Sequence, residues 1–64
     1  MTDDYRAQAY LLRKIDRIKG MKVPSERDQE KTFFMVSTQV LAEVGFLTHE
    51  QRFLWNERML REVG

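Results

Sequence analysis

The chain has 64 residues, with 11 Lys and Arg against 10 Asp and Glu, a net charge of +1, one histidine and no cysteine. This composition excludes disulfides and thiolate metal sites, and one histidine cannot make a structural zinc site without several carboxylate ligands. A chain this short buries only about 60% of its unfolded surface, so regular helix packing or oligomerisation must stabilise it. We expect one domain over residues 1–64, with no cofactor, that forms a homo-oligomer.

The apolar runs are too short to cross a membrane. The longest have four residues, FFMV being one, whereas a spanning helix needs roughly 20. The N-terminus, MTDDY, is acidic where a signal peptide carries positive charge. We therefore expect a complete small protein that is cytoplasmic and does not bind a membrane.

The first predicted helix covers about residues 3–19. Thr2 is placed to cap its start, and acidic residues follow where the helix dipole favours them. Gly20 accepts the left-handed conformation that ends many helices. The predicted apolar face consists of Tyr5, Ala9, Leu11, Leu12, Ile15 and Ile18.

The second predicted helix covers about residues 25–44 and follows the linker MKVPS. Ser25 and Asp28 approximate a capping box at its start, and Gly45 ends it. The predicted core face consists of Phe33, Val36, Val40 and Val44, widened by Phe34 and Leu41.

The third predicted helix covers about residues 48–62, and Thr48 with Gln51 forms a capping box at its start. The linker before it, GFL, is short, so the second and third helices should form a tight hairpin. The predicted fold is an all-α three-helix domain, and a hairpin that dimerises into a larger bundle fits the same spacing. The predicted apolar side consists of Phe53, Trp55, Met59, Leu60 and Val63, with Asn56 as a polar exception.

The second helix is more apolar than one core requires. Its apolar residues spread over roughly 160° of the helical wheel, whereas a helix that faces one core needs about 100°. Contact with two neighbouring helices explains part of this width, and the alternative is a second face for another chain. Leu54 also falls on the polar side of its helix. On the second interpretation, the expected protein interface consists of Phe34, Met35, Leu41, Leu54 and Trp55.

The first helix carries a positive stripe opposite its isoleucines, here called the basic stripe: Arg6, Tyr10, Arg13, Lys14 and Arg17. Three interpretations fit it: a solvated helix face, a surface for an acidic protein, or contacts to nucleic-acid phosphates. The segment 38–55 resembles a helix-turn-helix motif in its order of helix, glycine turn and capped helix. Two residues separate Ala42 from Gly45, where that motif has three.

Catalytic patterns are missing from the sequence. His49 falls in the first turn of a helix, and no glycine-rich phosphate loop is present. The preferred hypothesis is a non-enzymatic regulatory protein that binds and modulates, by inhibition, another protein. Proteins of this size often come from phages or mobile elements. The alternatives are a small DNA-binding transcriptional regulator that uses the basic stripe or segment 38–55, and a self-assembling structural protein.

Overall fold

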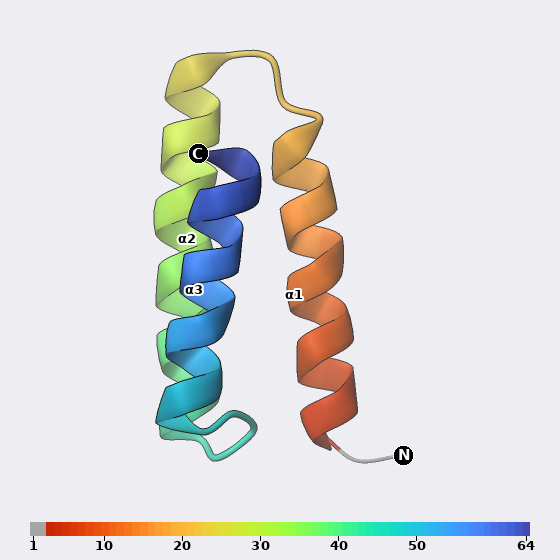
Figure 1. Ribbon diagram of the computed structural model, residues 1–64, viewed down its shortest axis with the longest axis vertical. Coiled ribbons are helices and arrows are strands. Elements are labelled where there is room, and N and C mark those ends of the chain that lie inside the picture. Colours follow the sequence, from red (N-terminus) through yellow and green to blue (C-terminus); the bar gives the residue numbers. More distant parts are fainter. Residues whose placement is uncertain (1–2) are drawn as a thin grey trace.

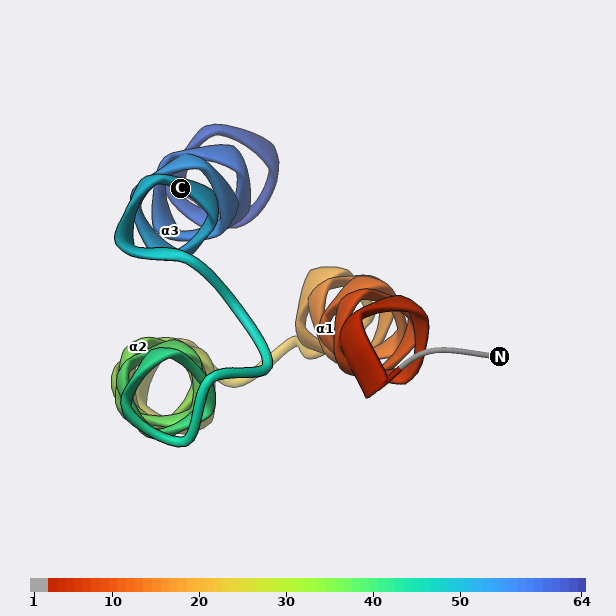
Figure 2. The same cartoon turned by 90° about the horizontal axis from the view of Figure 1, so that it is seen from below.

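The computed structural model describes residues 3–64 and contains the helices α1 (Asp3–Lys19), α2 (Pro24–Glu43) and α3 (His49–Val63). Each helix runs antiparallel to the one before it (Figure 1). Seen along the bundle, the three lie at the corners of a triangle (Figure 2). The predicted all-α domain with a tight hairpin of its last two helices is confirmed. Among the described residues, no helix combines the length and hydropathy needed to cross a membrane.

The two later helices begin in different ways. The Thr48 side chain accepts the Gln51 amide proton at 3.0 Å, and the Gln51 side chain accepts the Thr48 amide proton at 2.9 Å, as the sequence predicts. The predicted box of Ser25 and Asp28 is wrong, because α2 already starts at Pro24 and no side chain caps it. Proline at this position has a favourable fixed φ and no amide proton to satisfy.

The two predicted glycine stops also differ. Gly45 has a φ of +89°, and the Phe46 amide beyond it donates to the Leu41 carbonyl at 2.9 Å. This left-handed ending satisfies carbonyls that the last turn leaves free. Gly20 has no positive φ, so the prediction of a left-handed stop there is wrong. A tight turn ends α1 instead, and the predicted Thr2 cap lies outside the described residues.

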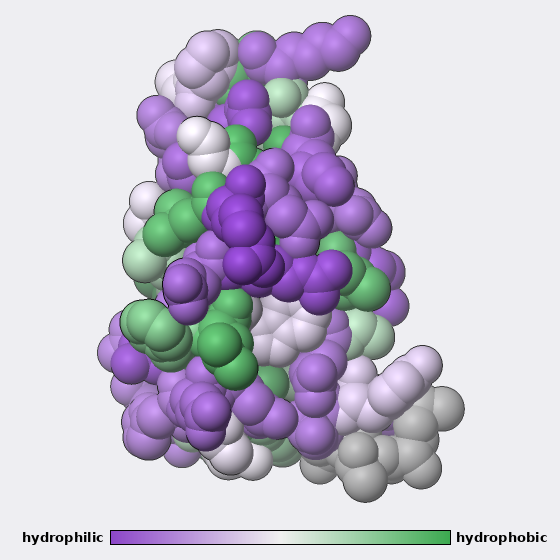
Figure 3. All heavy atoms as spheres, in the orientation of Figure 1, coloured by the Kyte–Doolittle hydropathy of each residue, from purple (hydrophilic) through white to green (hydrophobic). Residues whose placement is uncertain are grey.

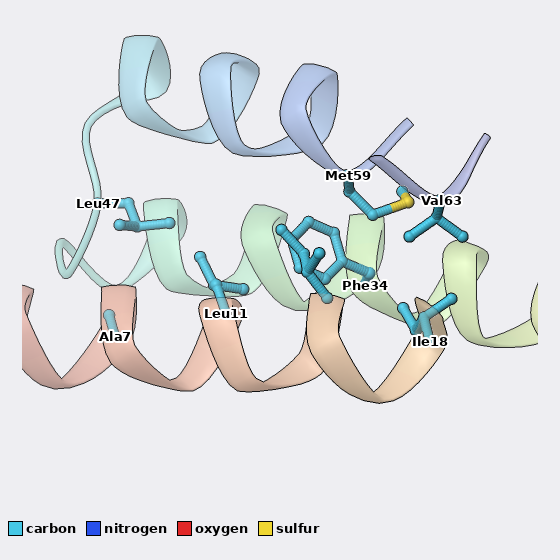
Figure 4. Packing of buried hydrophobic residues seen from close by; sticks show 8 residues of the cluster. Ala7, Leu11, Ile18, Phe34, Leu47, Met59 and Val63 are labelled. Carbon is cyan, nitrogen blue, oxygen red and sulfur yellow. The ribbon is translucent and has the colours of Figure 1, made fainter. Parts of the chain in front are cut away.

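The core lies where the three helices meet (Figure 4). On α1 the spacing of buried residues is that of one helical face, and Phe34 of α2 reaches in with only 2% of its surface exposed. Met59 and Val63 complete the core from α3, as predicted. The buried apolar side chains are Ala7, Leu11, Ile15, Ile18, Phe34, Leu47, Met59 and Val63, with Leu41, Ala42 and Trp55 packed against them.

The face of α2 that meets the core is centred away from the predicted one, on Phe34 and Leu41, which were predicted only to widen it. The predicted set, here called the apolar row, consists of Phe33, Val36, Val40 and Val44, and each is between 49% and 58% exposed. Phe34, Thr38 and Leu41 face inward instead. Phe34 is therefore also corrected as an interface residue, because the core covers its ring.

A polar pair explains why the buried side of α2 was missed. Thr38 is fully buried, and its Oγ1 lies 2.9 Å from the Met35 carbonyl oxygen and 2.8 Å from Asn56 Oδ1. A hydroxyl has one proton to donate. If the oxygen and nitrogen of the Asn56 side-chain amide are exchanged, the amide nitrogen donates to the Thr38 hydroxyl, and the hydroxyl donates to the Met35 carbonyl. Both side chains are then satisfied. The pair joins α2 to α3. The hydrogen bonds of the Thr38 hydroxyl are made within the protein, so a threonine can be buried in this core.

The other two helices also expose part of their predicted faces. On α1, Tyr5 and Leu12 are exposed while Ala7, which the sequence analysis left out, is buried. On α3, Phe53 and Leu60 are exposed. In a bundle of three short helices, each helix buries only a narrow face. Apolar residues at the border of that face therefore stay in contact with water.

Candidate protein-binding face

The basic stripe follows one side of α1. Each of its five residues has another member three or four positions away, which places them next to one another on a helix. The Lys14 ammonium lies 5.7 Å from the centre of the Tyr10 ring. Arg6, Arg13 and Arg17 are exposed, and in the described part of the chain no carboxylate forms an ion pair with a residue of the stripe.

The apolar row of α2 lies beside this stripe. Val36 and Val40 line a shallow groove of about 400 Å³ together with Tyr10, and Leu41 is also part of its lining. Tyr10 therefore belongs both to the basic stripe and to the wall of the apolar groove. The stripe and the row together form one surface, which we call the α1/α2 face.

Two further hollows extend this face. One is lined by Arg6 and Tyr10 from α1 and by Leu41 and Phe46. The other is lined by Tyr10 and the cations that follow it in the stripe. No residue of α3 lines any of the three hollows. α3 occupies the third corner of the bundle (Figure 2), so none of the helices in residues 3–64 covers the α1/α2 face.

The structure separates the five residues of the predicted interface. Phe34 is in the core, and Leu41 is partly buried at the groove of the α1/α2 face. Met35 and Leu54 are exposed on α2 and α3. Trp55 lines a different hollow, between α1 and α3. Val36 and Val40 were not predicted as surface residues, because their spacing is equally that of a core face.

The hollow between α1 and α3 contains polar groups that already have partners. The Arg58 guanidinium lies 5.2 Å from the Trp55 ring centre and donates to a Glu62 carboxylate oxygen at 2.6 Å. That hydrogen bond lowers the pKa of Glu62, which burial raises and Lys19 lowers further. The side of the molecule with α3 in front is largely hydrophilic, with separate apolar areas (Figure 3).

Groups suited to metal or acid–base chemistry do not cluster. The described residues include no set of three or more His, Cys, Asp and Glu side chains that could hold a metal ion. His49 is exposed in the first turn of α3. On the α1/α2 face, half-exposed apolar side chains lie beside cations that have no carboxylate partner among the described residues.

Comparisons with models of protein families, with curated proteins and with solved structures give no match to this chain.

Proposed function

We propose that this protein binds another protein through the α1/α2 face and inhibits it, without catalysing a reaction. The observation that supports this is the apolar row, which stays about half exposed beside cations that have no carboxylate partner in the described residues. Small soluble monomers rarely leave a contiguous apolar patch open unless it serves an interaction.

The energetics favour a macromolecular partner. Full burial of a Val or Phe side chain stabilises by about 1.5–3 kcal/mol, so four half-exposed side chains offer roughly 1 kcal/mol each to a covering surface. Part of this gain offsets the loss of translational and rotational freedom. A small molecule that fills one shallow groove reaches only some of these side chains, whereas a protein segment covers the whole row.

The capture of partners tests the proposal. The full-length chain is immobilised and exposed to extract from the cells that encode it, beside the variants Val36→Glu with Val40→Glu and Phe53→Glu with Leu54→Glu. Both variants add two negative charges at exposed apolar sites, and the second pair lies on α3, outside the α1/α2 face. We expect specific proteins on the wild type and on the α3 variant, and their loss on the α2 variant. Equal capture by all three would refute the proposal.

DNA binding is the second candidate, because the basic stripe is free of carboxylate partners. Against it, α3 returns antiparallel beside α2 (Figure 1), whereas a helix-turn-helix crosses its two helices at about 90–120°. Phosphate contacts would also leave the apolar row in water. Duplex DNA that binds at micromolar concentration, weakens steeply with salt and is lost on Arg13→Glu with Arg17→Glu would favour this candidate instead.

A further inference from the structure

The chemistry of the α1/α2 face specifies what kind of segment covers it, and this inference rests on the proposed function. We infer that the partner contributes an acidic amphipathic helix, which lies along the groove between α1 and α2. Its apolar side covers the apolar row, and its carboxylates meet the cations of the basic stripe. The incoming helix thereby becomes the fourth helix of a bundle that this chain leaves incomplete.

The dimensions of the face suit a helix. Residues 33–44 of α2 and residues 6–17 of α1 each extend about 16 Å, at 1.5 Å rise per residue. The apolar row has the spacing of three, four and four residues that is typical of helix-to-helix contacts. Because α1 and α2 are antiparallel neighbours (Figure 1), the row and the stripe follow adjacent helices, and Tyr10, Val36 and Val40 meet at one groove. A helix of about three turns covers both.

The charges of the face call for an acidic occupant. Cations line two of the three hollows, Arg6 in one and Arg13, Lys14 and Arg17 in the other, and no Asp or Glu lines any of the three. A neutral or basic helix on the apolar row would bring its flanking residues against these cations. An acidic helix gives each cation a partner, and complementary charges select one partner over another.

A second copy of this chain does not supply those carboxylates. A two-fold dimer uses the same patch on both copies. If the whole face is buried against its copy, either the two apolar rows meet and the two basic stripes also face each other, or each row meets the other copy's stripe. The first arrangement brings like charges together, and the second buries cations against valines.

Anionic membranes and nucleic acids fit the face less well. Both offer negative charge to the basic stripe, but phosphate backbones offer nothing to the apolar row. A lipid surface accepts apolar and basic groups together, yet it is flat on the scale of this molecule. The hollows around Tyr10 are concave, and a rod-like segment fills them.

An unbiased peptide selection tests the inference. A library of random 20-residue peptides displayed on phage is selected on the full chain, on Arg13→Glu with Arg17→Glu, and on Val36→Glu with Val40→Glu. Circular dichroism of each variant must match the wild type. We expect wild-type peptides with apolar residues at helical spacing and a net negative charge. The arginine variant should shift the selected charge toward positive, and the valine variant should enrich none of the same peptides.

The affinity of one enriched peptide, synthesised and measured by calorimetry, makes the test quantitative. We expect roughly ten- to thirtyfold weaker binding to the arginine variant, because two exposed ion pairs become repulsions. Binding to the valine variant should be lost, and Phe53→Glu with Leu54→Glu should change nothing. Binding to the wild type should also weaken with added salt.

The possible failures are distinguishable. Peptides that need Val36 and Val40 but carry no acidic excess would overturn the inference and leave the proposed function standing. No enrichment on the wild type would also overturn it, and the capture experiment then decides the proposed function separately. A dimer that disappears on Val36→Glu with Val40→Glu would make a second copy the occupant. Sedimentation with phosphatidylserine vesicles, or micromolar binding of duplex DNA, that requires both the stripe and the row would likewise overturn the inference.

Discussion

α1 and α2 are neighbours of similar length, 17 and 20 residues, but their sequences predict their orientation unequally well. α1 buries Leu11, Ile15 and Ile18 on one side and carries its cations on another, so its pattern predicts the buried side correctly except at the border of the apolar face. α2 has apolar residues on two sides, and the buried side includes Thr38. Periodicity therefore determines which face a helix buries only when a single face is apolar.

The largest expected effect distinguishes the two sides of α2. Phe34→Ala should lower the free energy of unfolding by about 3–5 kcal/mol, since it empties the core. Phe33→Ala, on the exposed row, should cost about 0.5–1 kcal/mol. Urea unfolding followed by circular dichroism measures both.

A domain of this size has only roughly 3–10 kcal/mol of stability, so Phe34→Ala can leave much of the chain unfolded. Phe34→Leu removes less volume and keeps a measurable transition. If the Phe33 substitution proves the more destabilising one, the face predicted from the sequence would be the true core face.

The next effect concerns the hydrogen bond between Thr38, on the buried side of α2, and Asn56 of α3. Thr38→Val keeps the shape but leaves the Asn56 amide without its partner, at a cost of about 1–2 kcal/mol. Asn56→Ala should cost less, because the Thr38 hydroxyl retains the Met35 carbonyl. In a double-mutant cycle we expect coupling of about 1 kcal/mol between the two sites. Strictly additive effects would mean that the pair does not hold α2 to α3.

A smaller effect compares the C-terminal ends of α1 and α2. Gly45→Ala should destabilise by about 1 kcal/mol, since its φ of +89° strains any residue with a Cβ. Gly20→Ala should be neutral or slightly stabilising, because an added Cβ there meets the Arg17 carbonyl oxygen at an ordinary 3.6 Å. In thermal unfolding, the melting temperature should fall for Gly45→Ala and should rise slightly or stay unchanged for Gly20→Ala. Equal losses would mean that α1 also ends in a left-handed residue.

The smallest effect concerns the two ion pairs of Glu62, one within α3 and one that joins the end of α1 to α3. Glu62 accepts from Arg58 at 2.6 Å and from Lys19 at 3.4 Å, and these contacts lower its pKa. A lowered folded-state pKa stabilises the protein above the ordinary glutamate pKa, and the contribution disappears as the pH falls through the lowered value. Glu62→Gln should therefore be slightly less stable than the wild type at neutral pH and equally stable in strong acid. A difference that grows on acidification would contradict the assignment.

Much of the fold follows from local chemistry, and the prediction succeeded where local chemistry decides. The Thr48 and Gln51 box and the Gly45 turn are contained within a few residues, so sequence reading located them. The basic stripe was also recognisable, because its spacing places it on one side of a helix wherever that helix packs. The start of α2 was predicted to within one residue, but the predicted capping box does not form, because Pro24 with its fixed φ takes the first helical position and places Ser25 inside the helix.

The amino-acid sequence by itself determined the number of helices, their approximate bounds, the hairpin and the stripe of cations on α1, because each depends on neighbours within one or two turns. Only the tertiary structure decided which side of α2 turns inward. That choice depends on Phe34 filling the space between α1 and α3, and on Asn56 reaching Thr38 across eighteen residues of chain. The same choice places the apolar row of α2 beside the basic stripe of α1. The sequence pattern of either helix alone does not predict that the two are neighbours.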